Sequence, residues 1–544
     1  MPVSRAVLLS AALLASAAFA SDSTPAAPPL LKGLGHWHHA ISTRDPVVQR
    51  HFDQGLRWVY AFNHDEAVRD FQFAAARDPH CAMCWWGVAL ALGPNINMPD
   101  VAPDQERQAL EAIARARAIP GVPPKEKAYV EAVAQRFAPP PNDRTALNRA
   151  YAKAMEELAK AQPKDADAQV LAAEAKMDLH PWRLWSADGQ PGLDTEAVVD
   201  ALAAVLQAHP DHPGANHFFI HALEASPHPE RALPEAKRLP TLMPAAGHIV
   251  HMPAHIYMRT GQYDLAVKAN EQAIQVDRAY LARKHPEGMY PMMYVAHNFS
   301  FLWAAASMEG SWKKASGAAE ALSARFPPDT MAMLLKMMPG MDFFVAPTVM
   351  VRIRFGKWDE LLALPDPGAS EPYLQAMWRY GRAVAFAAKG QKAQAEAEQK
   401  VFNGFVEAIP QDMALGPLNS ARAVMAVAKA SLDGELLLRR GEVAQAIPAF
   451  ERAVKAQDAL SYDEPPPWFL SPRQELGFAL LKAARPADAE AVYREDLKRF
   501  RENGWSLFGL RAALAAQKKP TAKVARRFRK AWAHADVTLT GSIF

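Results

Sequence analysis

Two pairs of histidines recur at a fixed interval and constrain the fold more than any other feature of this chain. His217 and His221 are four residues apart, and so are His251 and His255. The second pair follows the first at an interval of 34 residues (251 − 217 and 255 − 221). Residues four apart lie on one face of an α-helix, and 34 residues is a common length for a helix–turn–helix repeat unit. The spacing therefore predicts two successive helical units that carry their histidine pairs at matching places.

Helical periodicity extends over most of the remaining chain. Apolar residues recur at helical spacing, and the expected helices include 104–118, 124–137, 143–161, 165–179 and 194–208. Half of the 544 residues are hydrophobic, and many of these are alanines, which suit closely packed helices. A repeat array accommodates a chain of this length because each unit buries its apolar face on its neighbours.

Several segments resemble the tetratricopeptide repeat family. Units of this family have about 34 residues, and certain positions of the unit prefer a small side chain while others prefer a large one. Positions 8, 11, 20, 24, 27 and 32 are filled by Gly55, Trp58, Ala67, Phe71, Ala74 and Pro79. In a later unit, positions 8, 11, 15, 17, 20, 24, 27 and 31 are filled by Ala254, Tyr257, Gly261, Tyr263, Ala266, Asn270, Ala273 and Asp277. The resemblance implies an all-α fold, an α-solenoid in which helix pairs form a right-handed superhelix.

The expected organisation has four parts. A signal peptide (1–20) and a flexible leader rich in Pro and Ala (21–35) precede the repeats. An N-terminal repeat array (36–280) carries the clustered histidines. A C-terminal array (281–544) follows, and 505–534 are expected to form its capping helices.

The N-terminal residues have the pattern of a secretory signal. Arg5 precedes an apolar stretch (6–18), and Ala18-Phe19-Ala20 is a small–x–small cleavage motif. Cleavage is expected after Ala20, which places the mature chain in the periplasm or outside the cell. No later apolar run reaches the roughly 18 residues of a membrane-spanning helix, so no transmembrane segment is expected.

Charge and motifs argue against several classes of ligand. The formal net charge is only +3, which gives no support for nucleic-acid binding. The sequence has no phosphate-binding loop, so no nucleotide is expected. It also lacks the His-Glu-x-x-His and Gly-x-Ser-x-Gly signatures of hydrolases.

The only two cysteines, Cys81 and Cys84, form a Cys-x-x-Cys motif. Covalent haem would need a histidine directly after the second cysteine, and Trp85 stands there, so no haem is expected. In an oxidising compartment the pair predicts a local disulfide. A reduced pair, buried or binding a soft metal together with His80 and Met83, is the alternative.

The family resemblance also implies which residues face a binding groove. Positions 2, 5, 9, 12 and 13 of the first helix line the concave surface in the family, and here they are His248, His251, His255, Met258 and Arg259. His217 and His221 hold positions 5 and 9 of the preceding unit, and His297 holds position 2 of the following one. Six histidines from three units are therefore expected on one groove.

Clustered imidazoles are typical of transition-metal sites. Neighbouring helix axes lie about 8–10 Å apart, so imidazoles of adjacent helices can reach one ion. Eleven of the eighteen histidines lie in 180–297, which counts against a chance distribution. Neutral imidazole suits zinc and copper alike, and the methionines near the cluster favour copper unless they only fill gaps between helices. The sequence thus predicts a copper or zinc site.

Pro253 affects the geometry of this predicted site. A proline at position 7 of the unit removes an amide donor and clashes one turn back. The helix is therefore expected to kink, or to begin near His251. His248 would then be the first histidine to leave the cluster.

Three functions remain open on the sequence. The leading one is a non-enzymatic exported scaffold with a metal ion in its groove. The second is a metal-dependent enzyme that uses the same histidines, an open coordination position and Glu224 as the base. The third is an adaptor whose groove binds a protein or peptide partner without metal.

Overall fold

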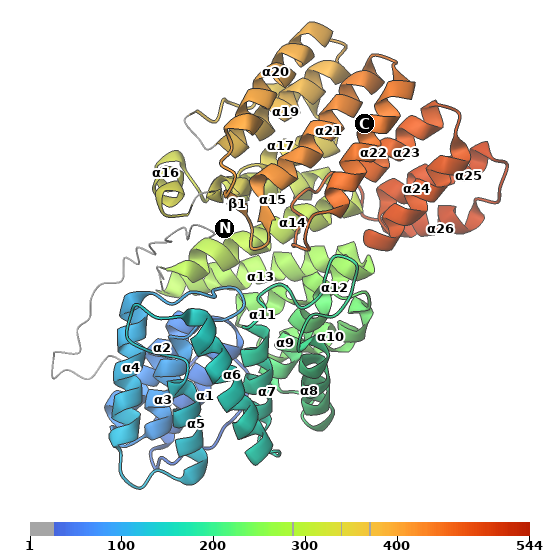
Figure 1. Cartoon of the computed structure of the whole chain (residues 1–544). Coiled ribbons are helices and arrows are strands. Elements are labelled where there is room, and N and C mark those ends of the chain that lie inside the picture. The colour runs from blue at the N-terminus through green and yellow to red at the C-terminus, as the bar shows by residue number, and fades with distance from the viewer. Residues whose placement is uncertain (1–26, 285–287, 339, 369–371) are drawn as a thin grey trace. The chain divides into compact units, whose positions relative to one another are not determined.

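The computed structural model describes residues 27–544 except 285–287, 339 and 369–371 (Figure 1). The predicted signal peptide and most of the predicted leader lie outside the described residues. Regular structure in the described part is almost entirely helical. Its one sheet is an antiparallel hairpin of β1 (Ala414–Leu415) and β2 (Asn419–Ser420). The predicted all-α class is confirmed.

The chain divides into two compact units. Among the described residues, the N-terminal unit comprises 27–256 and 272–295, and the C-terminal unit comprises 257–271 and 296–544. The predicted boundary between the arrays, at 280/281, falls within the continuous helix α13 (Tyr263–Lys284). The clustered histidines up to His255 all belong to the N-terminal unit.

The N-terminal unit is a series of helices in which each one packs on its neighbours in sequence. These helices are α1 (Pro46–Tyr60), α2 (His64–Arg77), α3 (Ala82–Ala91), α4 (Pro103–Ala118), α5 (Pro124–Ala134), α6 (Arg144–Ala161), α7 (Ala166–Met177), α8 (Thr195–Ala208), α9 (Pro213–Glu224), α10 (Leu233–Leu242) and α11 (Gly247–His251), with a short 3-10 turn (Pro229–Ala232) before α10 and a π-helical turn (Tyr290–Tyr294) near its end. The five helices predicted between 104 and 208 correspond to α4 to α8 and are confirmed, with ends that differ by three residues or fewer.

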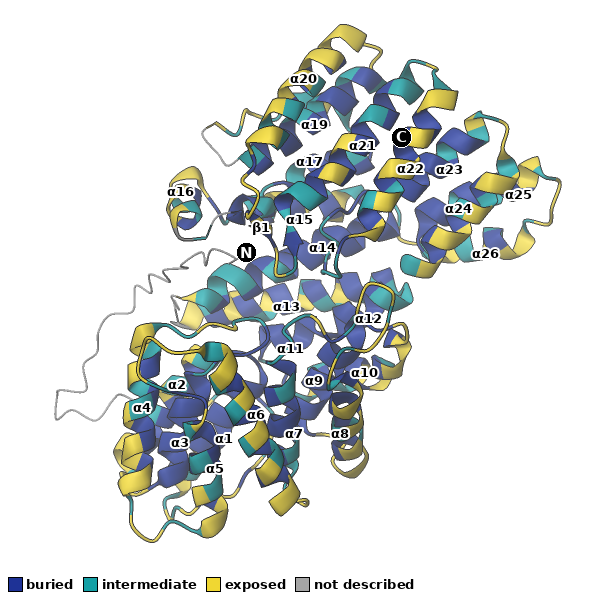
Figure 2. Ribbon diagram, viewed as in Figure 1, coloured by how far each residue is buried: buried dark blue, intermediate teal, exposed yellow. Residues whose placement is uncertain are grey.

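The remaining helices continue the same pattern of stacked pairs, so the α-solenoid class is also confirmed. They are α12 (Pro253–Thr260), α13, α14 (Val295–Glu309), α15 (Trp312–Ser323), α16 (Pro328–Met337), α17 (Pro347–Arg354), α18 (Trp358–Leu362), α19 (Pro372–Ala388), α20 (Lys392–Ala408), α21 (Ala421–Arg439), α22 (Val443–Asp458), α23 (Pro472–Lys482), α24 (Pro486–Arg499), α25 (Gly504–Ala516) and α26 (Ala522–Ala531), with a 3-10 turn at Met341–Phe344. Buried residues line the faces where helices meet, and exposed residues lie on the outer faces (Figure 2). None of the helices in the described part has the length and apolar character needed to cross a membrane.

A left-handed turn joins the two helices of at least eight pairs in the described chain. The residue after the first helix has positive φ, its N–H bonds the carbonyl three residues back, and the next N–H bonds the carbonyl five residues back. Glycine holds this position at Gly261, Gly310, Gly356, Gly390 and Gly441, and the other three turns have Phe62, Ala484 and Lys518. The left-handed conformation costs a non-glycine residue about 1–2 kcal/mol, so these three residues are under backbone strain.

Two backbone features set the direction of α11 and α12. At Gly247, the first residue of α11, an added Cβ would lie 1.9 Å from Asp277 Oδ1, so the Asp277 side chain would have to move to admit any other residue. Tyr290 Oη accepts the His248 N–H at 3.1 Å and donates to Asp277 Oδ1 at 2.9 Å. The break predicted from Pro253 is present, since α11 ends at His251 and α12 begins at Pro253.

Replacement of a strained turn residue by glycine is expected to stabilise the fold. Lys518 is exposed and has φ +56°, so Lys518→Gly relieves strain and removes no packing. Relief of about 1–2 kcal/mol exceeds the ~0.4–1 kcal/mol of extra chain entropy that glycine brings to the unfolded state. We expect a gain of about 0.5–1 kcal/mol in unfolding free energy, measured by urea denaturation. Gly441→Ala, in an equivalent turn with open space at Cβ, should be destabilising. A lower midpoint for Lys518→Gly would contradict this account of the turns.

Candidate metal centre

Five histidines of the N-terminal unit lie on α9, α11 and α12: His217, His221, His248, His251 and His255. None of their side chains is more than 4% exposed. The rings of His217 and His221 are 4.8 Å apart between centroids, and so are those of His251 and His255, as the four-residue spacing predicts. The rings of His248 and His251 lie 5.9 Å apart and join the two pairs into one contiguous cluster, which we call the histidine cluster.

Three of these imidazoles converge closely. One ring nitrogen from each of His217, His221 and His248 lies within 4.8 Å of the other two. His217 Nε2 and His248 Nε2 are 3.1 Å apart. The expectation that His248 leaves the cluster is wrong. The bend after His251 leaves α11 in place, because Gly247 and Tyr290 fix the start of that helix.

Oxygen atoms fix which ring nitrogen of His217 and His221 faces the centre. His217 Nδ1 lies 2.7 Å from the backbone oxygen of Tyr60, and His221 Nδ1 lies 3.0 Å from Glu224 Oε1. Carbonyl and carboxylate oxygens only accept, so both Nδ1 atoms carry the proton and donate. Each Nε2 is therefore unprotonated and has a lone pair, and an unprotonated ring nitrogen is the atom that can bind a metal. Within the described residues His221 Nε2 is buried and makes no hydrogen bond.

Glu224 holds two histidines at once. Its Oε2 lies 2.6 Å from His255 Nδ1, while Oε1 accepts from His221. Burial alone would raise the pKa of this carboxyl, but the neighbouring His255 and His221 outweigh burial and lower the pKa to about 2. Glu224 is therefore an ionised carboxylate that orients imidazoles, as carboxylates do beside metal-bound histidines. A general base working near neutral pH needs a higher pKa and a free oxygen, so Glu224 is poorly suited to the role of base.

The second pair has a similar geometry. His251 Nε2 and His255 Nε2 lie 2.9 Å apart. Metal–nitrogen bonds of about 2.0–2.1 Å at tetrahedral angles place ligand nitrogens roughly 3.3–3.4 Å apart. The Nε2–Nε2 separations of His217 and His248 and of His251 and His255 are a few tenths of an ångström shorter. Small movements of the rings would therefore accommodate an ion.

Electrostatics keep His217 in the form that binds metal. Burial is the main cause that lowers its pKa well below the usual value of 6.5, and the nearby His221 lowers it further. The imidazole is therefore neutral at neutral pH, with an Nε2 lone pair that faces His248 Nε2.

An aromatic ring that sequence reasoning missed covers the converging imidazoles. The Phe62 ring centroid lies 4.6 Å from that of His217, 5.8 Å from His221 and 5.6 Å from His248. Trp182 also meets His221 edge-on at 5.9 Å. A signal for Phe62 was present in the sequence, since it occupies the turn position that glycine holds in most other units.

Buried polar contacts hold Tyr60, which sequence reasoning also missed. Its hydroxyl donates to Asp167 Oδ1 at 2.5 Å. The same carboxylate accepts from Trp37 Nε1 at 2.9 Å and His39 Nδ1 at 2.7 Å, and His212 Nε2 lies 3.3 Å away. We call this set the Asp167 network. It ties the segment before α1 to α7 and α9.

Three residues expected in the groove belong to the C-terminal unit. Met258 is buried in α12, and Arg259 is half-buried and lies over the Tyr462 ring at 5.4 Å. His297 lies in α14, where its ring is 4.8 Å from that of Phe301. Their part in a metal or ligand site stays a prediction.

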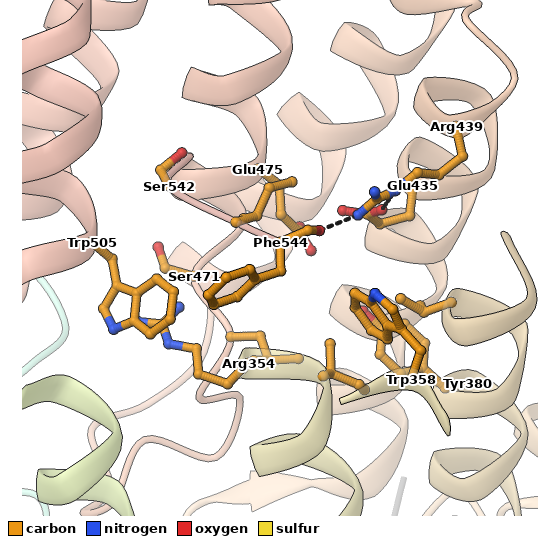
Figure 3. Close-up of a pocket in the computed structure, with 14 residues that line it drawn as sticks. Arg354, Trp358, Tyr380, Glu435, Arg439, Ser471, Glu475, Trp505, Ser542 and Phe544 are labelled. Atoms are coloured by element: carbon orange, nitrogen blue, oxygen red, sulfur yellow. Dashed lines mark hydrogen bonds and ion pairs between the residues drawn. The ribbon is translucent and has the colours of Figure 1, made fainter. Parts of the chain in front are cut away.

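The C-terminal unit contains a cavity that is lined in part by its own last residues, 542–544 (Figure 3). Arg439 donates to the backbone oxygen of Phe544, and the Phe544 ring meets Trp505 with centroids 5.8 Å apart. Ser542 Oγ donates to the Gln474 carbonyl at 2.9 Å. No histidine lines this cavity, so it offers none of the chemistry of the histidine cluster.

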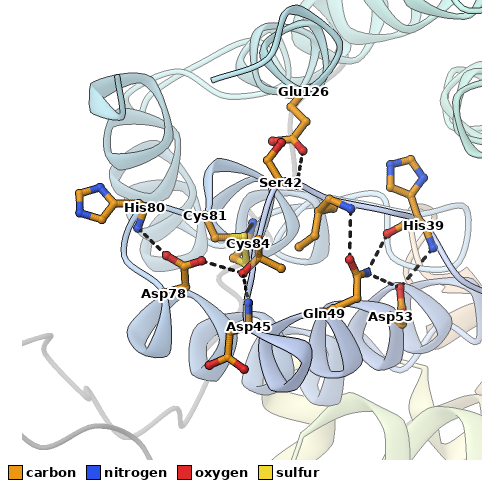
Figure 4. Close-up of a disulfide and its surroundings, with 12 residues drawn as sticks. His39, Ser42, Asp45, Gln49, Asp53, Asp78, His80, Cys81, Cys84 and Glu126 are labelled. Carbon is orange, nitrogen blue, oxygen red and sulfur yellow. Dashed lines mark hydrogen bonds between the residues drawn. A yellow bond between two sulfur atoms is a disulfide. The ribbon is translucent and has the colours of Figure 1, made fainter. Parts of the chain in front are cut away.

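Cys81 and Cys84 form a disulfide at the start of α3 (Figure 4). Both residues are buried, and the His80 ring points away from the sulfurs (Figure 4). Asp78 Oδ1 accepts the His80 N–H at 3.2 Å. Bonded sulfurs offer no thiolate, so this disulfide is not a soft-metal site.

Comparisons with known proteins do not place the chain in a family. No protein-family model matches the sequence, and no curated protein matches it. Among solved structures, human IFIT1 dimer with m7Gppp-AAAA is 11% identical over 91% of this chain and 92% of that chain, with a TM-score of 0.32. The APC/C hetero-tetramer Cut9-Hcn1 is 12% identical over 90% and 88%, with a TM-score of 0.28. Naa15/Naa10 bound to HypK-THB is 12% identical over 90% and 89%, with a TM-score of 0.23. Such low scores carry no argument about this chain, so its fold is assigned from its own helices.

Loss of the charge at the centre of the Asp167 network is expected to destabilise the N-terminal unit. Burial would raise the pKa of Asp167, but the hydrogen bonds from His212 and His39 outweigh it and lower the pKa below the ordinary 3.8. Burial would lower the pKa of His39, but Asp167 outweighs it and raises the pKa above the ordinary 6.5. Asp167→Asn leaves buried partners unpaired and should cost about 3 kcal/mol near neutral pH.

The sign of the pH dependence follows from these two shifts. The Asp167 contribution is present above pH 3.8 and is lost as pH falls, whereas the His39 contribution is present below pH 6.5 and is lost as pH rises through its raised pKa. The difference between wild type and Asp167→Asn should therefore be largest between pH 3.8 and 6.5 in urea denaturation with a chelator present. Asp188→Asn, at an exposed site of the same unit, is the matched control. A difference that is independent of pH would contradict the assignment.

Proposed function

We propose that this protein is an exported helical scaffold that binds a transition-metal ion, copper or zinc, in its histidine cluster. The observation that carries the proposal is the orientation of the rings. His217 and His221 each donate Nδ1–H to an oxygen, which leaves a lone pair on Nε2, and one nitrogen of each ring lies within 4.8 Å of a nitrogen of His248. Three imidazole nitrogens from rigid helices are enough ligands for one ion.

The chemistry of the donor set supports copper or zinc over harder ions. Neutral imidazole suits these ions, whereas magnesium and calcium prefer oxygen ligands. The buried Nε2 of His221, without a partner in the described part of the chain, fits a ligand position better than a packing role. When bound, the ion would supply a positive charge that the ionised Glu224 partly balances.

Binding without catalysis is the reading that the local geometry supports best. Glu224 is engaged with two imidazoles and has a pKa of about 2, so it serves to orient ligands rather than to move protons. The disulfide and the N-terminal signal pattern support an exported protein in an oxidising compartment. A protein or peptide partner for such a scaffold is also part of the proposal.

Metal content tests the proposal directly. Protein produced with its native N-terminus and without a histidine tag should contain about one equivalent of copper or zinc by elemental analysis. His217→Ala/His221→Ala should lose it, because two of the three converging ligands disappear. His228→Ala, an exposed histidine of the same unit, should keep it.

Added copper or zinc should also stabilise protein from which metal has been removed with a chelator, by about 2.7 kcal/mol when the ion is at a hundredfold excess over its Kd. Protein without metal whose stability is unmoved by copper and zinc would overturn the proposal. A function as a metal-free adaptor would then be favoured.

Glu224→Gln tests the orienting role. An amide cannot accept from both imidazoles, so metal affinity should fall about 10–100-fold in competition with a chelator. Glu230→Gln, exposed and paired with His228, should leave the affinity unchanged. Unchanged affinity for Glu224→Gln would count against the orienting role.

A further inference from the structure

Phe62 occupies a backbone position that disfavours its side chain. It has φ +55° in the left-handed turn between α1 and α2, where five equivalent turns have glycine. The other two exceptions, Ala484 and Lys518, are a small residue and an exposed one. A bulky residue with positive φ is a genuine outlier, and such outliers concentrate at functional sites. The ring of Phe62 therefore calls for a specific explanation.

The turn directs this ring onto the three converging imidazoles. Phe62 is 4% exposed, and its ring plane is within 22° of those of His221 and His248. It meets the His217 ring at 61° with the shortest centroid distance of the three, 4.6 Å. No single packing partner accounts for this arrangement, because one ring contacts all three histidines.

The same turn also supplies the oxygen that orients His217. The Tyr60 carbonyl, two residues before Phe62, accepts from His217 Nδ1 at 2.7 Å. Tyr60 and Phe62 thus fix the tautomer of one imidazole, stack a ring against those of His221 and His248, and meet the His217 ring in a T-shaped contact. A glycine at position 62 would relax the backbone and remove these ring contacts.

We propose that Phe62 is a positioning residue of the candidate metal centre. Its ring holds the imidazoles of His217, His221 and His248 in their converging arrangement and keeps water from that side of the ion. The bound ion then has few water ligands, which favours ions that accept a low coordination number over ions that retain several waters. This inference rests on the proposed metal-binding function.

Cobalt(II) is the probe that tests it, because it enters zinc-type imidazole sites and its visible absorption is stronger at low coordination number. Phe62→Leu keeps apolar bulk but removes the flat ring, and Phe62→Gly removes the ring and the strain. We expect both to weaken cobalt affinity by about tenfold or more, the loss typical of outer-sphere partners. Absorption per bound cobalt should also fall, because water adds to the ion. Phe62→Tyr, which restores an aromatic ring, should recover both properties.

Lys518→Gly is the matched control, because it removes the same kind of turn strain in the C-terminal unit, outside the histidine cluster, and should leave the cobalt affinity and spectrum unchanged. A packing role alone would change stability without changing the spectrum of bound cobalt. Affinity within twofold of wild type together with an unchanged spectrum, in Phe62→Leu, would overturn the inference while the metal-binding function stands. Wild-type protein that binds neither cobalt nor zinc would overturn both. Should Phe62→Gly fail to fold, Phe62→Leu and Phe62→Tyr decide the result.

Discussion

The histidine cluster depends on hydrogen bonds from imidazole Nδ1 atoms to oxygens. A buried imidazole can present either nitrogen, and only its partner decides which one carries the proton. Tyr60 supplies that partner for His217, and Glu224 supplies it for His221. Without these acceptors the same residues on the same helices would present mixed tautomers, and the cluster would have no defined ligand set. The helices therefore position the acceptor oxygens of Tyr60 and Glu224 as well as the imidazole rings.

Much of the fold could be predicted from the sequence because it repeats. The interval of 34 residues between histidine pairs and the glycines of the turns reflect local rules of helix length and helix termination. Helices such as α4 and α8 begin and end close to where periodicity places them. The division of the chain could not be foreseen in this way. It crosses the chain within α12, within α13 and at the start of α14.

The site was predictable only in part. Four-residue spacing placed His217 with His221 and His251 with His255, because helix geometry alone brings such pairs together. The place of His248 depends on Asp277 and Tyr290, which contact α11 from later in the chain. The position of Pro253 in the sequence does not reveal these tertiary contacts. Phe62 reaches the cluster through a strained turn and the packing of α1 on α9. Contacts of this kind are tertiary and leave no local pattern.

The hydrogen bond between Tyr60 and His217 joins residues 157 positions apart. A chain that emerges in order from a ribosome or a translocation channel must therefore dock α1 onto α9 before the first ligand acquires its tautomer. While the chain is extended, its histidines are scattered and have only the weak affinity of single imidazoles. On the proposed metal-binding function, the ligand set would thus be assembled late, after folding has brought α1 onto α9, and ions would be captured only by folded molecules.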